Sequence, residues 1–210
     1  MRIEVLCTSP DHPVNPWLDR WRIANRDRAQ IVVRRNVDEL KGGDLLFLVS
    51  CSQIVGPQDR AKFTHSLVLH ASALPRGRGM SPHIWQILEG SNEIVLSMLE
   101  AEDKVDTGRI WRQAPIRFDG TELYDEINAK VFDAEIELMD WAVENFACVE
   151  PRSQQGEATY YKRRTPEDSK VSPDASIAEI FDLLRVSDPE RYPAFFEYRG
   201  ARYEISLKKR

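Results

Sequence analysis

Three polar features lie close together in the middle of the sequence. His70 ends the apolar run 66–70, and the loop Arg76–Gly79 (Arg-Gly-Arg-Gly) follows it. Asp106 stands before Thr-Gly, where the chain must turn. An imidazole can move a proton near neutral pH and a carboxylate can orient it, while an arginine- and glycine-containing loop before a helix favours anion binding. A buried core histidine and a turn aspartate are the structural alternatives, so the combination is what favours chemistry.

The segments around these residues predict a small α/β sheet with crossover helices. The continuous apolar runs Asp44–Ser50 and Ser66–His70 indicate strands buried on both faces, which is typical of parallel sheets. Ligands gather at the carboxyl ends of such strands, where Ser50 and His70 both lie. Other strands are expected at Ile3–Cys7, Ile31–Val33, Glu93–Glu100 and Gly108–Phe118, and helices at Trp17–Ile23, Pro57–Phe63, Ser81–Leu88 and Thr121–Asn145.

The composition changes at Pro151, which predicts two parts, residues 1–150 and 151–210. The second part begins with a polar linker, Arg152–Glu157, and an extended piece, Tyr160–Arg164. A helix at Ser176–Arg185 and a hairpin around Arg199-Gly-Ala complete a small C-terminal α+β module.

Composition narrows the classes of protein. With 42% apolar residues in 210, the chain can bury a substantial core, and no apolar stretch approaches the ~20 residues that span a bilayer. The first residues read directly into a strand without the pattern of a signal peptide, so a cytoplasmic protein without membrane contact is expected. Cys7, Cys51 and Cys148 are far apart and form no CxxC pair, so neither a metal site nor a disulfide framework is expected.

The charge balance disfavours a large nucleic-acid surface. The formal net charge is −5, whereas binding to a phosphate backbone needs a concentrated basic patch. The two dense basic runs, Lys162–Arg164 and Lys208–Arg210, are interpreted as solvated surface.

Taken together, these features resemble the folate-dependent formyltransferase family, which includes methionyl-tRNA formyltransferase and the sugar N-formyltransferases. Leu69–Pro75 (Leu-His-Ala-Ser-Ala-Leu-Pro) resembles the motif around the family's catalytic histidine, Asn-x-His-x-Ser-x-Leu-Pro. Asp106-Thr-Gly108 resembles its Asp-x-Gly motif. The resemblance covers residues 44–111 well and the C-terminal module more weakly. It implies a Rossmann-like formyltransferase domain at 1–150 with a mostly parallel sheet.

The resemblance also implies the chemistry. The formyl donor would be 10-formyltetrahydrofolate, and no metal is needed. His70 would stabilise a tetrahedral oxyanion or move the amine proton, while Asp106 would orient His70 and favour its charged form. The residues expected to contact the donor, with core packing as the alternative for Ile54 and Val55, are Gln53, Ile54, Val55, Glu102, Asp103 and Lys104.

Two departures from the family pattern stand out. Val68 occupies the position of the family's asparagine, and valine cannot donate a hydrogen bond to an oxyanion. Losing one such donor typically raises the barrier by about 2.7–4 kcal/mol. Protonated His70, the Ser72 hydroxyl or a backbone N–H are the candidate substitutes. The second departure is Thr8–Pro13, which replaces a Gly-rich loop after the first strand.

The acceptor is expected to be a small molecule. The sequence most resembles bacterial sugar N-formyltransferases, including a pseudaminic-acid-pathway type, which implies the amine of an amino sugar, nucleotide-linked and destined for a surface glycan. A non-catalytic folate- or sugar-binding homologue and a 10-formyltetrahydrofolate hydrolase are the alternatives, and the oligomeric state is open. The expected acceptor contacts are Ser72, Arg76, Gly77 and Arg78.

Overall fold

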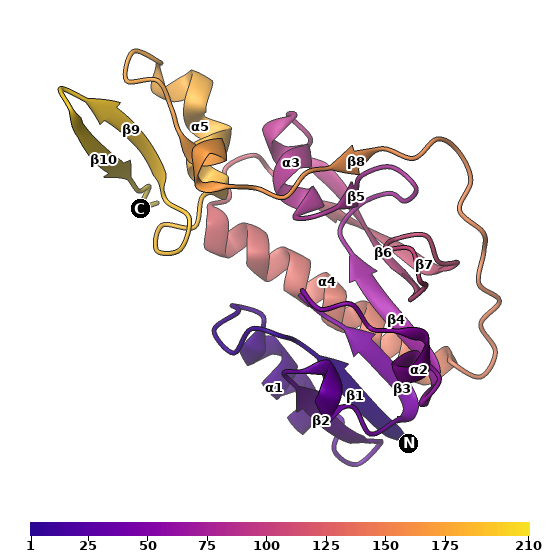
Figure 1. Cartoon of the computed structure of the whole chain (residues 1–210). Helices are drawn as coiled ribbons and strands as arrows, with labels where there is room; N and C mark the ends of the chain where they lie inside the picture. Colours follow the sequence, from indigo (N-terminus) through magenta and orange to yellow (C-terminus); the bar gives the residue numbers. More distant parts are fainter.

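The centre of the protein is a six-stranded sheet in the order β2-β1-β3-β4-β6-β7 (Figure 1). The computed structural model describes residues 1–210. Neighbours among β2, β1, β3 and β4 are parallel, whereas β6 and β7 are antiparallel to the strands beside them. The mostly parallel α/β sheet expected from the sequence is therefore confirmed. The strands are β1 Arg2–Leu6, β2 Gln30–Arg34, β3 Gly43–Leu48, β4 Phe63–His70, β6 Glu93–Glu100 and β7 Ile110–Arg117.

Two helices, α1 (Asn15–Ala24) and α4 (Tyr124–Asn145), contribute to the main core and contact each other. The core comprises 30 buried residues from these helices, the sheet strands and neighbouring segments. The indole N–H of Trp21 donates to Asp140 at 2.6 Å, which fixes α1 on α4. This packing leaves the other face of the sheet to shorter segments and loops.

The opposite face carries a smaller core and no long helix. The short helices η1 (Val37–Glu39) and α2 (Pro57–Arg60) lie on the connections there, beside a cluster of Leu6, Leu40, Leu46, Val55 and Phe63. The helix expected over residues 57–63 ends early because Phe63 already pairs with Gly43 as the first residue of β4. Loops on this side are therefore free to form a site.

The connection from β4 to β6 contains β5 (Arg78–Gly79) and α3 (Pro82–Leu88). β8 (Tyr160–Tyr161) pairs in parallel with β5, so a segment that follows α4 returns to this connection. The extended piece expected at residues 160–164 is thus shorter, since its pairing partner β5 has two residues. Residues after α4 therefore reach the neighbourhood of His70.

The C-terminal residues form η2 (Pro166–Ser169), α5 (Ile177–Val186) and a hairpin of β9 (Ala194–Tyr198) and β10 (Ala201–Ile205). In Figure 1 this hairpin and α5 stand together beyond one end of α4. The division of the chain at residue 150 stays a prediction. No helix is long and apolar enough to cross a membrane.

Candidate active site

His70 is the last residue of β4, at the carboxyl end of the parallel strands. The residue is 7% exposed, and its Nε2 donates to the carbonyl oxygen of Gly77 at 2.8 Å. Alternation along β4 places it on the same face as Val68, whereas Leu67 and Leu69 enter the main core. The imidazole therefore lies on the side of the sheet where the short helices and loops are found.

Asp106 lies in the loop between β6 and β7 and reaches His70 from there. Its Oδ1 is 3.5 Å from His70 Nδ1, and its Oδ2 accepts a hydrogen bond from the Gly79 N–H at 2.9 Å. The backbone of Asp106 is left-handed, with φ 59°, a conformation that aspartate adopts more readily than most residues. Gly108 makes the tight turn possible, because a Cβ there would lie 1.8 Å from the Glu100 carbonyl oxygen.

Both ring nitrogens of His70 face hydrogen-bond acceptors. A carbonyl oxygen can only accept, so Nε2 carries a hydrogen in its contact with Gly77. The carboxylate of Asp106 approaches the other ring nitrogen, so the imidazole is held between Gly77 and Asp106. With Asp106 7% exposed, the pair is shielded from water, which strengthens its electrostatic interaction.

The loop after His70 is closely packed around Gly77. This glycine has φ 72°, and a Cβ on it would lie 2.9 Å from Ser72 Cβ. Its N–H donates to Thr159 Oγ1 at 2.8 Å, so the C-terminal part of the chain holds the same residue whose carbonyl accepts from His70. Ser72 is 1% exposed and its hydroxyl has no hydrogen-bond partner. Its contact with an acceptor stays a prediction.

The two arginines of this loop differ in their surroundings. Arg76 is exposed, whereas Arg78 donates to Gln154 Oε1 at 2.6 Å and to the Tyr160 hydroxyl at 3.2 Å. Arg76 is thus the side chain of the pair that remains available to an anion. The sequence did not single out Thr159, Gln154 or Tyr160, because they lie beyond α4 in a polar stretch.

The two segments expected to contact the donor lie next to each other. Arg60 donates to the carbonyl of Val55 at 2.8 Å and forms an ion pair with Asp103, which joins residues 53–55 to residues 102–104. Val55 is 5% exposed and belongs to the small core, whereas Ile54 is 73% exposed. Core packing therefore describes Val55, and Ile54 presents an apolar side chain to an incoming ligand.

Of the other residues predicted to contact the donor, one is engaged within the fold and two are exposed. Gln53 accepts a hydrogen bond from the Val37 N–H at 2.9 Å, so its amide oxygen is bonded to the segment that follows β2. Glu102 and Lys104 are exposed beside Asp103. Their roles stay predictions.

Val68, at the family's asparagine position, is half-buried against Leu74, Leu99 and Ile110. The apolar contacts explain how valine is accommodated there but supply no donor for an oxyanion. The N–H groups of Gly77 and Gly79 are already paired, whereas the Ser72 hydroxyl has no partner, so His70 and Ser72 are the candidate donors.

His83, on α3, is a second imidazole near His70. Burial lowers the pKa of His83 to about 4, and the neighbouring His70, His12 and Arg164 lower it further. His83 is therefore neutral at neutral pH, and the nearby imidazole that faces a carboxylate is that of His70.

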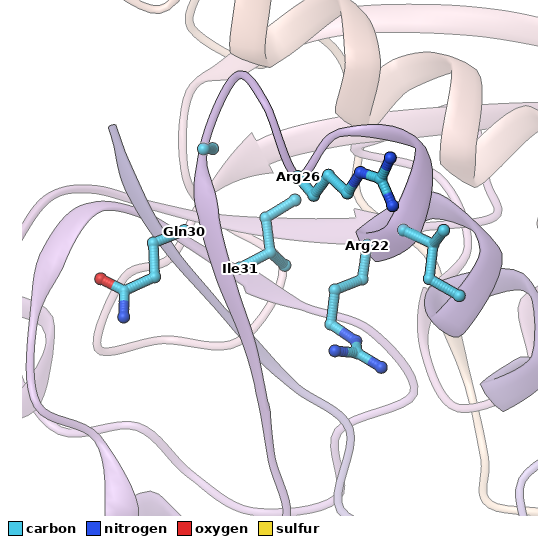
Figure 2. Close-up of a pocket in the computed structure, with 6 residues that line it drawn as sticks. Arg22, Arg26, Gln30 and Ile31 are labelled. Carbon is cyan, nitrogen blue, oxygen red and sulfur yellow. The ribbon is translucent and has the colours of Figure 1, made fainter.

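Two cavities of the protein differ in how close they lie to His70 and Asp106. One of about 280 Å³, shown in Figure 2, is lined by Arg22, Arg26 and Gln30 among others. It lies at the amino end of the edge strand β2, whereas His70 lies at the carboxyl end of β4. Arg22 in this cavity pairs with Asp19. A second, of about 520 Å³, is lined by Arg76, Gly77 and residues of α3 and β8. This one adjoins the loop that holds His70.

Solved structures support the same fold over the whole chain. Methionyl-tRNA formyltransferase from Clostridium thermocellum superposes with a TM-score of 0.85 at 26% identity, covering 99% of this chain and 92% of that one. A sugar N-formyltransferase from a Shewanella species gives 0.77 at 15% identity, covering 100% and 98%. HypX from Aquifex aeolicus in complex with tetrahydrofolic acid gives 0.81 at 18% identity, and this chain spans 37% of its length.

The sequence itself matches a family profile over more than half of its length. The profile is that of the formyl transferases, and the match covers residues 9–143, which include His70 and Asp106. It confirms the family and the enzyme class that the motifs around these two residues predicted. The chain therefore belongs to the formyl transferase family and is a formyltransferase.

Proposed function

We propose that this enzyme transfers the formyl group of 10-formyltetrahydrofolate to the primary amine of an amino sugar, with His70 and Asp106 as the chemical pair. The observation that carries the proposal is the approach of these two buried side chains to 3.5 Å at the carboxyl end of β4. Both residues lie within residues 9–143, the part of the chain that matches the formyl transferase family.

The residues beside the pair fit a reduced folate. Ile54 is an exposed apolar side chain next to the segment 102–104, and Val105, directly after that segment, is another. Exposed apolar side chains of this kind suit an aromatic ring system. The related fold of HypX in complex with tetrahydrofolic acid supports a folate as the donor.

The reaction needs a hydrogen-bond donor that stabilises the negative charge developing on the formyl oxygen. The amine nitrogen attacks the formyl carbon, the bond between that carbon and the folate nitrogen breaks, and the amine proton goes to the folate nitrogen. In this mechanism the Nε2–H of a protonated His70 is released from the Gly77 carbonyl and donates to the formyl oxygen of the intermediate, while Asp106 orients the ring at Nδ1. His70 then passes this proton to the leaving nitrogen and regains one from the attacking amine. Because Val68 has no hydrogen to donate, this task falls to His70, with the Ser72 hydroxyl as a second candidate.

The proposed acceptor is supported by the charges of the protein and by the descriptions of similar structures. Arg76 is an exposed cation beside the 520 Å³ cavity and suits the phosphate of a nucleotide-linked sugar. Two similar folds are described as a sugar N-formyltransferase and a 4-N formyltransferase, and the first description supports a sugar amine as the acceptor. A surface glycan as the destination of that sugar is part of the proposal. The net charge of −5 argues against tRNA, the acceptor named for the Clostridium thermocellum protein.

The test is an assay with 10-formyltetrahydrofolate and a panel of free and nucleotide-linked amino sugars, read by tetrahydrofolate formation and by the mass of the product. A formylated sugar supports the proposal. Formate release without an acceptor indicates a hydrolase, and folate binding without turnover indicates a non-catalytic homologue. Undiminished turnover in both His70→Asn and Asp106→Ala would remove the pair from the mechanism.

A further inference from the structure

Gln154 lies in the segment between α4 and β8, far from His70 and Asp106 in the sequence. Just before it, Arg152 and Ile110 exchange two backbone hydrogen bonds of 2.7 and 2.8 Å, which fix the segment beside the start of β7. The half-buried side chain of Gln154 points from there to the loop that carries Asp106.

The amide of Gln154 makes three hydrogen bonds. Its Nε2 donates to the carbonyl oxygens of Asp106 and Gly108, both at 2.9 Å. Its Oε1 accepts from Arg78 at 2.6 Å. Carbonyl oxygens can only accept and a guanidinium can only donate, so the orientation of the amide is fixed by its three partners.

These bonds connect the two loops that form the site. Arg78 precedes Gly79, whose N–H holds the carboxylate of Asp106. Gln154 therefore joins the backbone on both sides of that contact. Asp106 lies in a turn where its carbonyl oxygen accepts no backbone hydrogen bond, and Gln154 supplies the donor for it.

We propose that Gln154 is a positioning residue for formyl transfer, which holds the Asp106 loop so that the carboxylate faces His70. The role rests on the proposed function of that pair. Gln154 acts through Asp106, so its loss affects the geometry of the charged pair and leaves the donor-binding segment 53–55 unchanged.

The decisive variant is Gln154→Glu, which keeps the size of the side chain but turns an oxygen toward two carbonyl oxygens. The control is Gln155→Glu, the same charge change at the adjacent exposed residue. We expect kcat of Gln154→Glu to fall by about tenfold to 100-fold, because small misplacements of reacting groups have effects of this size. The change in the KM for 10-formyltetrahydrofolate should be smaller than the fall in kcat, although residues 102–104 lie in the same loop. Gln155→Glu is expected to match the wild type.

The second readout is the NMR spectrum of the His70 imidazole in ¹⁵N-histidine-labelled protein, which needs no turnover. In Gln154→Glu its signals should shift in the direction seen in Asp106→Asn. If Gln154→Glu does not fold, Gln154→Met removes the same donors without adding charge and serves in its place.

The outcomes separate this role from the proposed function. Wild-type protein inactive toward every amine refutes the proposed function, and the His70 signals still decide the role of Gln154. A folded Gln154 variant with wild-type kcat or unshifted His70 signals, or with its loss confined to KM, would overturn the positioning role.

Discussion

The Nδ1 atom of His70 lies 3.5 Å from Oδ1 of Asp106, although α3 and β6 separate the two residues in the chain. β6 runs antiparallel to β4 and passes His70 at Ser97, and the loop that follows β6 carries Asp106. The left-handed backbone of Asp106 then accompanies the approach of its carboxylate to the imidazole. The pair is therefore a product of sheet topology and of one uncommon backbone conformation.

Asp106→Asn is expected to lower kcat by about 100-fold or more, because it removes the negative charge that orients and stabilises a protonated His70. Asparagine adopts the left-handed conformation readily and still accepts the hydrogen bond from Gly79, so the thermal midpoint should stay close to that of the wild type. Steady-state kinetics and thermal unfolding check both parts. Asp106→Ala, which loses that hydrogen bond as well, should be less stable by about 1–3 kcal/mol.

Gly77→Ala is expected to reduce both stability and kcat. Its Cβ would meet Ser72 Cβ at 2.9 Å in a backbone with φ 72°, so the carbonyl that accepts from His70 must move. The strain should lower the free energy of unfolding by about 1–3 kcal/mol.

The control for this change is Gly200→Ala, in the hairpin of β9 and β10. Gly200 also has a positive φ, 80°, but a Cβ there has no atom within 4 Å. It should lose stability through backbone strain alone and keep its kcat, as measured by urea unfolding and the formyl transfer assay. Equal losses of kcat in the two variants would contradict a specific role for the Gly77 carbonyl.

The sequence predicted the parts of the site that local pattern determines. Apolar runs indicated β3 and β4, and the ends of those strands indicated where His70 would lie. The motifs around His70 and Asp106 predicted a shared role, which the folded chain supports by bringing the two together.

Residues that act through long-range contacts could not be found in this way. Gln154 and Thr159 stand in a polar stretch that is typical of a linker, and composition carries no information about which carbonyl or N–H a side chain will meet. Arg78 illustrates the same limit, because its partners Gln154 and Tyr160 could not be foreseen, and its expected anion contact stays a prediction.

Val68→Asn restores the side chain that the family carries at this position. We expect it to leave kcat unchanged, because His70 supplies the donor in the proposed mechanism. It should cost about 1–3 kcal/mol of stability, because the amide would lie among Leu74, Leu99 and Ile110. Kinetics and urea unfolding of the variant test this. A large gain in kcat would show that no group had replaced the missing amide.

Glu135, on α4, gives a prediction about pH and stability. Burial raises the pKa of Glu135 from 4.5 to about 8, and its Oε2 has no hydrogen-bond partner. Between these two values the folded protein binds a proton that the unfolded chain has released, so stability falls as the pH rises from about 5 to 8, by at most about 1.4 kcal/mol per pH unit.

Glu135→Gln should remove this fall, because a glutamine has no proton to lose. The variant should resemble the wild type near pH 5 and exceed it increasingly toward pH 8, in urea unfolding measured at several pH values. Glu137→Gln, an exposed change on the same helix, should keep the wild-type pH dependence. Parallel curves for the wild type and Glu135→Gln would mean that Glu135 is ionised in the folded protein, with a cation or water that compensates its burial.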